Sequence, residues 1–198
     1  MKSGSLLYTP LIAGLKGKGW NLYTQFGEDG LIEGCLDLVG RTSRHCFEIG
    51  AADGRFFSNT LRLRQQGWHA VLIEKDEKQF SKLKEEFGEQ STCIHRTVTD
   101  LDAELAKTGI AYRPDVGVID IDGQDWHLWN AMHEYRPRIM LVEILPADIH
   151  AAVPVLGAGA GQAGLDAIKD LGTRKGYTLV ATTHCNALFI DKKEMAKH

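Results

Sequence analysis

The sequence predicts an α/β protein with a mostly parallel sheet, and three observations lead to this class. From Cys46 onward, short runs rich in β-branched residues alternate with longer segments of helical pattern, which is typical of parallel sheets. The last two apolar runs are separated only by residues around His184 to Asn186. That separation is too short for a crossover helix, so this pair must be antiparallel. A length of 198 residues suits one domain with a full core.

The elements follow from the same alternation, because each apolar run is bounded by turn residues and each helical segment has an apolar face. The expected strands are 46–50 (CFEIG), 69–75 (HAVLIEK), 91–98 (STCIHRTV), 116–122 (VGVIDID), 138–145 (RIMLVEIL), 177–183 (YTLVATT) and 186–192 (NALFIDK). Helices are expected near 58–66, 77–87, 100–107, 125–135 and 164–175. We expect residues 1–44 to form an N-terminal arm and helix, and residues 45–198 to form the core of the same domain.

Composition excludes several classes of function. The chain has 23 Lys plus Arg against 26 Asp plus Glu, a net charge of -3 without long blocks of one sign, so we expect no nucleic-acid partner. Four scattered cysteines suggest neither a zinc site nor a disulfide framework, and indicate a reducing, cytoplasmic setting. No apolar run approaches the roughly 20 residues of a membrane span, so no membrane partner is expected. The oligomeric state stays open.

The first expected strand ends in EIGAADG, with Glu48, Gly50 and Gly54 in the pattern acid-x-G-x-x-x-G before a helix. Glycines let the backbone turn tightly and approach a ligand, and a helix N-terminus offers free N–H groups. A pyrophosphate would be repelled by Glu48 and by Asp53 in the turn. S-adenosylmethionine carries an ammonium and a sulfonium group, so acidic residues around this turn favour it as the cofactor.

Two further acidic residues extend this interpretation along the sheet edge. Glu74 ends the second strand, where an acidic residue accepts hydrogen bonds from the ribose hydroxyls of an adenosine ligand. Asp100, beyond the third strand, is placed to accept from the adenine amine. The alternative is that each is a solvated charge or a helix cap. We favour the cofactor, because Glu48, Gly50, Gly54 and Glu74 all fall at the ends of successive strands.

The segment DIDGQDWHLW concentrates the candidate catalytic residues. On a strand, Asp120 and Asp122 project to the same side, and Glu143 could bring a third carboxylate to that edge. One hypothesis is a Mg²⁺ site that binds the oxygens of an acceptor. Another makes one of the carboxylates, His127 or His150 a general base for a hydroxyl. In a purely structural alternative, Asp122 and Asp125 cap the next helix and the tryptophans pack on the sheet.

These motifs together resemble the FkbM-like group of class I S-adenosylmethionine-dependent methyltransferases over most of the chain. The similar segments are QFGEDG (25–30), FEIGAADGRFFSNT (47–60), GWHAVLIEKD (67–76), VIDIDGQDWHLW (118–129), MLVEILP (140–146) and GYTLVATTHCNALFI (176–190). The resemblance implies a Rossmann-like fold with a seven-stranded sheet, an antiparallel last strand and helices on both faces. It also implies methyl transfer to a small-molecule acceptor, often a hydroxyl of a sugar or natural product.

The resemblance also assigns roles to residues. It implies that Glu48, Gly50, Asp53 and Gly54 line the methionine end of the cofactor, that Glu74 binds the ribose, and that Asp120 lies beside the methyl group. Gln25, Glu28 and Asp29 match a segment that folds over the cofactor.

Two other functions compete with methyl transfer. Gly159, Gly161 and Gly164 in GAGAGQAG have the spacing G-x-G-x-x-G of an NAD-dependent oxidoreductase. However, Pro154 in the preceding stretch cannot donate to a central parallel ladder, so we expect no strand that delivers a nucleotide turn here. The FkbM-like resemblance instead implies that this segment lies at the rim of an acceptor pocket. The other competitor is a non-catalytic methyltransferase-like binding module, which would need a damaged cofactor motif. The motif here is intact.

Overall fold

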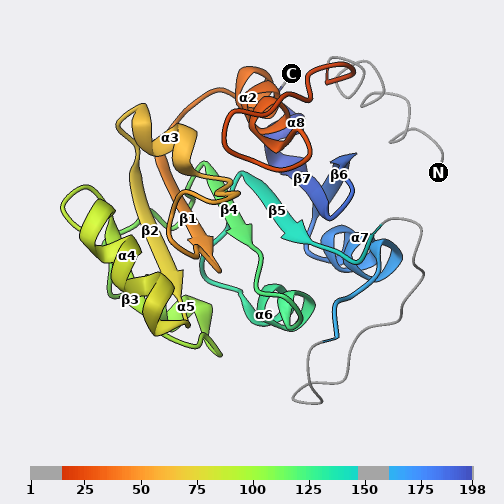
Figure 1. Ribbon diagram of the computed structural model, residues 1–198. Coiled ribbons are helices and arrows are strands. Elements are labelled where there is room, and N and C mark those ends of the chain that lie inside the picture. The colour runs from red at the N-terminus through yellow and green to blue at the C-terminus, as the bar shows by residue number, and fades with distance from the viewer. Residues whose placement is uncertain (1–14, 147–160, 198) are drawn as a thin grey trace, which may run out of the picture.

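A computed structural model of the chain describes residues 15–146 and 161–197. In this part of the chain the sheet has seven strands in the order β3-β2-β1-β4-β5-β7-β6 (Figure 1). They are β1 (His45–Ile49), β2 (His69–Glu74), β3 (Thr92–His95), β4 (Val116–Ile119), β5 (Ile139–Glu143), β6 (Tyr177–Thr182) and β7 (Asn186–Asp191). The first five pair in parallel, and β7 is antiparallel to β5 and β6. The predicted fold class is confirmed.

Helices cover both faces of this sheet (Figure 1). They are α2 (Glu28–Val39), α3 (Leu61–Gln65), α4 (Glu77–Phe87), α5 (Leu101–Leu105), α6 (Asp125–Ala131), α7 (Leu165–Arg174) and α8 (Lys192–Met195). Side chains of α2, α3, α4 and α8 join one hydrophobic cluster, and those of α5, α6 and α7 join a second. Side chains alternate along a strand, so Cys46 of β1 belongs to the first cluster and Phe47 to the second.

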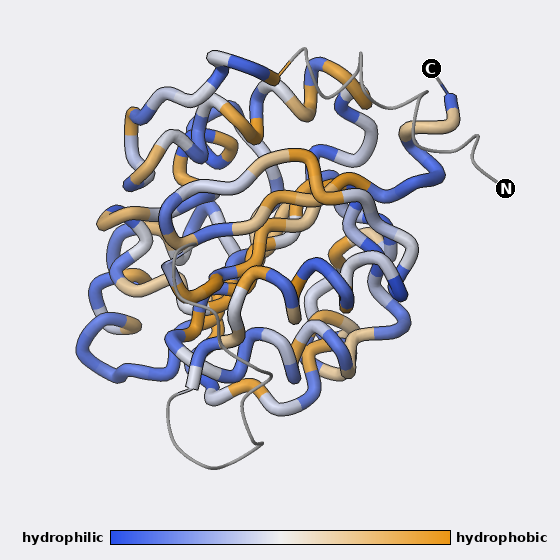
Figure 2. Tube along the Cα trace, turned by 90° about the vertical axis from the view of Figure 1, so that its right-hand side faces the viewer, coloured by the Kyte–Doolittle hydropathy of each residue, from blue (hydrophilic) through white to orange (hydrophobic). Residues whose placement is uncertain are grey.

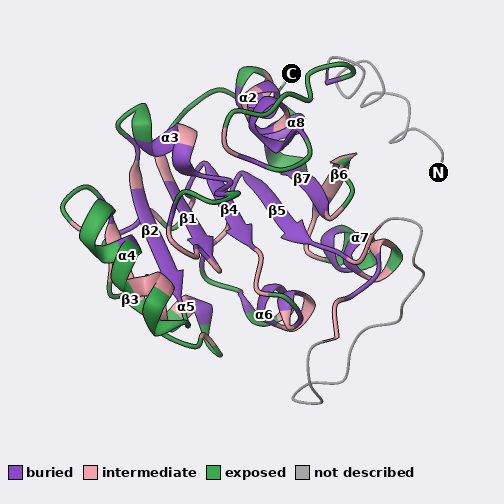
Figure 3. Ribbon diagram, in the orientation of Figure 1, coloured by how far each residue is buried: buried purple, intermediate pink, exposed green. Residues whose placement is uncertain are grey.

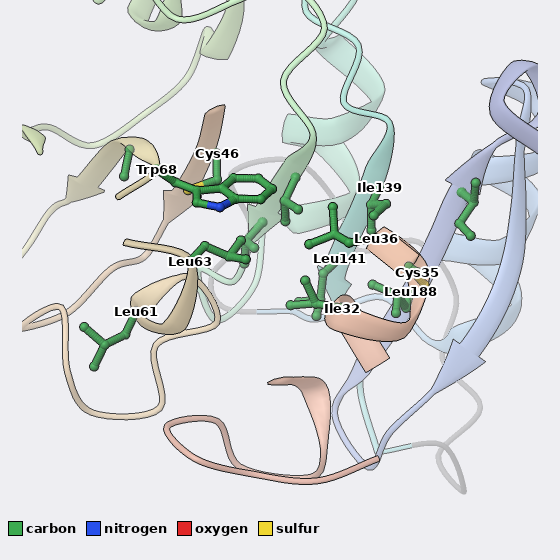
Figure 4. Close-up of a cluster of buried hydrophobic side chains, with 14 of the residues drawn as sticks. Ile32, Cys35, Leu36, Cys46, Leu61, Leu63, Trp68, Ile139, Leu141 and Leu188 are labelled. Carbon is green, nitrogen blue, oxygen red and sulfur yellow. The ribbon is translucent and has the colours of Figure 1, made fainter. Parts of the chain in front are cut away.

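The hydrophobic stretches of the chain gather along the central strands (Figure 2). Exposed residues lie mainly on the outer sides of the helices and in loops (Figure 3). In the first cluster, Ile32 and Leu36 of α2 lie over Leu141 and Leu188 of β5 and β7 (Figure 4). This packing fixes α2, and with it the segment before α2, against the middle of the sheet. In the described ranges, no helix is both long and apolar enough to cross a membrane.

The order of the strands determines where a ligand can bind. The chain moves from β1 outward to β2 and β3, and then returns to the other side of β1 with β4 and β5. Open parallel sheets bind ligands at the carboxyl ends of their strands, where the order reverses in this way. The reversal lies between β1 and β4, directly beside the sequence EIGAADG that follows β1.

Candidate active site

Four acidic side chains lie at the carboxyl ends of neighbouring strands. Glu48, Glu74 and Glu143 stand at the ends of β1, β2 and β5, and Asp120 directly follows β4. The three glutamates are between 2% and 8% exposed, so this edge of the sheet carries several buried carboxylates. Isolated buried carboxylates are strongly disfavoured, which makes this edge the candidate active site.

The turn after β1 packs directly against the end of β4. Gly50 has a φ of +85°, and a Cβ built on it would lie 1.7 Å from the carbonyl oxygen of Asp120. Its N–H and that of Ala51 both donate to the carbonyl oxygen of Ile73 in β2, at 2.9 and 3.1 Å. Glycine is therefore required at position 50, because any side chain would push the turn away from β4.

Gly54 makes room for a helix. A Cβ at this position would lie 2.6 Å from Leu83 and 2.8 Å from the ring of Phe87, both in α4. The space that a side chain would fill is thus occupied by α4. The glycine lets the turn pack on that helix, which differs from the expected close approach to a ligand.

Glu48 is held by the loop that leads from β1 to α3. Its carboxylate accepts hydrogen bonds from Ser58 Oγ at 2.7 Å, from Asn59 N at 2.7 Å and from Thr60 Oγ1 at 2.6 Å. The sequence analysis did not single out these three partners. Because both carboxylate oxygens are engaged, Glu48 fixes residues 58–60, just before α3, against β1.

Glu74 joins the glycine turn to the end of β2. One carboxylate oxygen accepts from Ala52 N at 2.8 Å, and the other accepts from Asp76 N at 2.7 Å. Ala52 has a φ of +45°, a left-handed conformation that this hydrogen bond helps to hold. Each carboxylate oxygen has a second lone pair, so Glu74 keeps acceptor capacity for two ligand hydroxyls.

Two more of the predicted cofactor carboxylates, Asp53 and Asp100, lie in a turn and at the start of a helix. Asp53 accepts from Arg55 N at 2.9 Å and from Phe56 N at 2.8 Å. Partial burial acts to raise the pKa of Asp53, but these two hydrogen bonds outweigh it and the pKa falls below its usual value. Asp100 is exposed and caps α5, accepting from Ala103 N at 3.0 Å. One of its oxygens is therefore committed to the helix.

The loop after β4 corrects one geometric expectation. The strand ends at Ile119, and Asp122 has a φ of +56°, so the strand alternation stops before it. The Asp122 side chain is exposed, while its N–H donates to Glu143 Oε2 at 2.9 Å. The strand expected at 116–122 is therefore three residues shorter, and the strand alternation on which the placing of Asp120 and Asp122 was based does not extend to them.

Asp125 holds this loop in place. Its carboxylate accepts from Ile121 N at 2.9 Å and from Gly123 N at 3.0 Å. Burial raises the pKa of Asp125 to about 6, against the lowering effect of these hydrogen bonds. The N-cap of α6 is Gln124 without a side-chain hydrogen bond, so neither Asp122 nor Asp125 is the cap. Trp129 is fully buried against Tyr177 and Phe189, as expected for a packing residue.

Asp120 and Glu143 share a strongly acidic environment. Burial, followed by the charges of Asp125 and Asp122, raises the pKa of Glu143 to about 7. Burial, followed by the charge of Glu143, raises the pKa of Asp120 well above its usual value. The two groups are coupled, because ionising one disfavours ionising the other. At neutral pH this pair can hold a proton or accept one, which is the property that a general base needs.

Replacing Glu143 with glutamine should stabilise the protein at pH 8 by on the order of 1–3 kcal/mol and leave its stability at pH 5 little changed. Burial raises the folded-state pKa of Glu143 from 4.5 to about 7, so the folded protein binds more protons than the unfolded chain between these values. The wild-type glutamate is therefore least destabilising below pH 4.5, and its contribution worsens as the pH rises through about 7. Glutamine removes this dependence and still accepts from Asp122 N.

Urea unfolding at pH 5 and pH 8 measures the difference in the free energy of unfolding. The matched control is Glu89→Gln, since Glu89 is exposed and makes no hydrogen bond or ion pair with the residues described here. The control should change stability equally at both pH values. An equal effect of Glu143→Gln at the two pH values would contradict the raised pKa.

The structure does not support the magnesium hypothesis. Among the described residues, no group of three or more His, Cys, Asp or Glu side chains could hold a metal ion. The charge of Asp122 acts on both Asp120 and Glu143, but its side chain is exposed. His150, a further catalytic candidate, and Gly159 lie outside the described residues.

The segment before α2 and the β6–β7 turn meet at the same edge. Glu28, only 1% exposed, accepts from Phe26 N at 2.7 Å, from Thr183 Oγ1 at 2.6 Å and from Asn186 Nδ2 at 3.2 Å. Asp29 accepts from the N–H groups of residues 22–24, which shapes the segment itself. The expected segment 25–30 therefore lies next to a chain turn more than 150 residues away.

Cys185 of the β6–β7 turn is a site neighbour that the sequence analysis missed. Burial raises the pKa of this thiol to about 12, and the charges of Glu28, Asp120 and Glu143 add to the effect. The thiol lies 3.7 Å from Gln25 Oε1. Its position could have been inferred from the expected hairpin, since the link after β6 must lie at the carboxyl end of β5.

The described end of the glycine-rich segment also lies at this edge. The side chain of Gln162 hydrogen-bonds to Glu143, and the carbonyl oxygen of Ala163 accepts from Leu145 N at 3.0 Å. Gly164 then precedes α7 as its N-cap. The segment thus runs beside the end of β5, where the sequence analysis placed the rim of an acceptor pocket.

A cavity of about 300 Å³ lies at the opposite edge of the sheet, near the start of β6. It is lined by Asn130, Met132, His133, Tyr135, Arg136, Arg174, Lys175 and Tyr177. Lys175 Nζ donates to the carbonyl oxygens of Met132 at 2.6 Å and Asn130 at 3.4 Å, and burial lowers its pKa to about 8. These contacts satisfy the carboxyl end of α6, so the lysine has a structural role there.

Comparison with known proteins places this arrangement among solved folds. The sequence matches no protein-family model. No curated protein is significantly similar to it. The structure is similar to magnesium protoporphyrin IX methyltransferase (ChlM) from Synechocystis PCC 6803 with bound SAH, at 14% identity, with a TM-score of 0.52 over 82% of this chain and 79% of that one.

Two further solved structures have a similar fold. A TehB-like SAM-dependent methyltransferase from Corynebacterium glutamicum is 15% identical, with a TM-score of 0.51 over 93% of this chain and 96% of that one. An S-adenosylmethionine-dependent methyltransferase from Clostridium acetobutylicum is 10% identical, with a TM-score of 0.53 over 82% and 89%. At such identities the similarity establishes the fold. The chain thus has the fold of S-adenosylmethionine-dependent methyltransferases.

Proposed function

We propose that this protein is an S-adenosylmethionine-dependent methyltransferase. The observation that carries the proposal is the contact of Glu74 with the glycine turn, through the hydrogen bond from Ala52 N. It places a carboxylate with free acceptor capacity beside a tight turn at the point where the strand order reverses. The structural neighbours supply a second, independent support, since they share the fold and one of them contains bound SAH.

The residues of this edge suit the parts of the cofactor. Glu74 would accept hydrogen bonds from the ribose hydroxyls, and Asp53 would face the ammonium group of the methionine end. The pKa of Asp53 lies below its usual value, so this carboxylate stays charged well below neutral pH. When bound, S-adenosylmethionine would supply an electrophilic methyl group. Positioning of the acceptor then makes the main demand on the protein.

We further propose that the methyl acceptor is a hydroxyl of a small molecule. A hydroxyl must lose its proton as its oxygen attacks, so it benefits from a nearby base. Asp120 and Glu143 are the groups whose protonation is tuned for this role, because burial and the charges of neighbouring carboxylates raise the pKa of both. The FkbM-like resemblance of the sequence supports the same assignment.

The two competing functions find less support. An NAD-dependent oxidoreductase would need G-x-G-x-x-G in the turn after β1, and that turn reads GAADG. A non-catalytic module with this fold would not need a buried carboxylate pair with raised pKa values at the acceptor side. Measured binding of NAD distinguishes the oxidoreductase from a methyltransferase. Measured turnover distinguishes the non-catalytic module from an enzyme.

Calorimetry with S-adenosylmethionine, S-adenosylhomocysteine and NAD tests the cofactor. We expect both sulfur compounds to bind and NAD not to bind. Glu74→Ala should weaken both by about 1.5–3 kcal/mol, roughly 10- to 150-fold in Kd, because it removes charge-assisted hydrogen bonds to the ribose. Glu74→Gln should show an intermediate loss, since one acceptor oxygen remains.

The matched control is Glu77→Ala, which removes the same charge from an exposed position three residues away. The control should bind both compounds as tightly as the wild type. Circular dichroism establishes that each variant is folded. Wild-type affinity in folded Glu74→Ala would refute the ribose assignment, and binding of NAD alone would refute the proposed function.

A further inference from the structure

The wall of the candidate site beside the carboxylate pair is built from two distant segments. Phe26 belongs to the segment before α2, and His184 belongs to the β6–β7 turn. Their ring centroids lie 5.1 Å apart with an interplanar angle of 58°. Both side chains are exposed, Phe26 by 44%, so an aromatic surface remains open after the rings have contacted each other.

Cys185 and Gln25 link this aromatic pair to Asp120 and Glu143. Cys185, which follows His184, is close enough to both carboxylates for their charges to raise its pKa. Its thiol also contacts Gln25, the neighbour of Phe26. Through the backbone, Ile144 N donates to the carbonyl oxygen of Cys185 at 2.8 Å. Cys185 thus contacts the end of β5 and connects it to His184, its chain neighbour, and to Gln25, the chain neighbour of Phe26.

Glu28 holds the two halves of this wall together. Its buried carboxylate accepts from Phe26 N on one side, and from Thr183 and Asn186 on the other. The Oδ1 atom of Asn186 is buried and has no hydrogen-bond partner among the described residues. A buried carbonyl oxygen of this kind is costly unless a donor reaches it, which indicates a polar group or water at the foot of the wall.

The strength of the base limits the hydroxyl that it can deprotonate. Burial and the neighbouring acids raise the pKa of Glu143 to about 7. An aryl hydroxyl, such as that of tyrosine, has a pKa of about 10, and an aliphatic hydroxyl is a much weaker acid. Proton transfer is most efficient when the pKa values of the two partners are close. The carboxylate pair is therefore better matched to an aryl hydroxyl.

We propose that the methyl acceptor is a neutral, planar aryl hydroxyl that packs against Phe26 and His184. This inference rests on the proposed methyltransferase function. The aryl O–H proton passes to the Asp120–Glu143 pair, and the oxygen bonds to the methyl carbon. The carbon–sulfur bond breaks and its electron pair stays on the sulfur, which becomes a thioether. A carboxylate on the acceptor would be repelled by the acidic edge, so a neutral ring is favoured.

Matched pairs of acceptors test this proposal. Phenol and 2-naphthol are each compared with their saturated counterparts, cyclohexanol and decahydro-2-naphthol, by the formation of S-adenosylhomocysteine. We expect the aryl compounds to be methylated at least 10-fold faster. Phe26→Leu keeps an apolar side chain but removes the ring, and should reduce kcat/KM for 2-naphthol at least 10-fold. The affinity for S-adenosylmethionine should stay unchanged.

The control variant is Tyr112→Leu. Tyr112 is 67% exposed and stacks on the buried Tyr135 at the opposite edge of the sheet, so the substitution removes an exposed ring from another aromatic pair. It should leave methylation unchanged. Equal rates for aryl and saturated acceptors, no turnover of either aryl compound, or full activity of Phe26→Leu would each overturn the proposal. Each of these results with intact S-adenosylmethionine binding leaves the proposed function standing, whereas loss of cofactor binding in the wild type refutes both.

Discussion

Replacing Arg138 with methionine should reduce the free energy of unfolding by about 3–5 kcal/mol, because it breaks a buried ion-pair network. Arg138 is 5% exposed and contacts Asp115 at 2.8 Å and Glu194 at 2.9 Å. It also donates to the carbonyl oxygens of Gly40 and Val39. Methionine fills similar volume but leaves two buried carboxylates without their shared cation. The loss is large beside a typical stability of about 5–15 kcal/mol.

Urea unfolding at pH 7 measures this loss, with Arg41→Met as the control. Arg41 pairs with Glu33 and Asp37 at the surface, so its replacement should reduce stability by less than about 1 kcal/mol. A loss from Arg138→Met as small as that of the control would show that the network contributes little to stability.

The same network predicts a dependence on pH. Burial acts to raise the pKa of Glu194, but hydrogen bonds from Arg138, Lys197 and Arg113 outweigh it and lower the pKa to about 2. The folded-state pKa lies below the unfolded one, so the stabilisation is fully present above pH 4.5 and is lost as the pH falls toward 2. The difference between wild type and Arg138→Met should therefore shrink between pH 5 and pH 3.

Local signals in the sequence predicted those elements that local interactions determine. The helix expected at 77–87 is α4 with the same bounds, because Asp76 caps it through Gln79 N and Leu83 and Phe87 supply its apolar face. The antiparallel end of the sheet followed from the short link around His184 to Asn186, since no helix fits into it. In both cases the deciding residues lie within a few positions of each other.

Where a predicted helix boundary was wrong, a distant carboxylate accepts hydrogen bonds from the residues that were expected to be helical. The helix expected at 58–66 begins only at Leu61, because residues 58–60 are bound to Glu48 of β1. The helix expected at 125–135 ends at Ala131, because the carboxylate of Asp102 accepts the N–H groups of residues 133–135. Such contacts cross the chain and leave no periodic signal in the sequence.

The candidate site also has a part that the sequence predicted and a part that it did not. Glu48, Glu74, Asp120 and Glu143 could be placed at one edge from the sequence, because parallel strands bring their carboxyl ends together. Their partners could not be assigned, since Ala52 N and Asp122 N meet these carboxylates only through left-handed backbone conformations. Phe26 and His184 were also missed as site residues. Their contact depends on Glu28, whose partners Thr183 and Asn186 lie more than 150 residues away.

Replacing Gly50 with alanine should destabilise the protein by roughly 2–6 kcal/mol, from about 1–3 kcal/mol of backbone strain and a similar penalty for overpacking. The strain arises from the φ of +85°, and the steric clash arises because the new Cβ would lie 1.7 Å from the carbonyl oxygen of Asp120. That oxygen belongs to the backbone and cannot rotate away. The turn must shift instead, which would also move Ala52 N away from Glu74.

Gly109→Ala separates the two contributions to this loss. Gly109 has a φ of +71°, and a Cβ there would have nothing within 4 Å, so it carries the backbone strain without the clash. Urea unfolding of both variants should show a loss at least about 1 kcal/mol larger for Gly50→Ala. Folded Gly50→Ala should also bind S-adenosylmethionine more weakly than Gly109→Ala, because the displaced turn no longer positions Glu74. Equal stability and equal affinity of the two variants would contradict this prediction. They would mean that the backbone at the end of β4 shifts to make room for the new side chain, and that close packing of the turn on β4 does not shape the site.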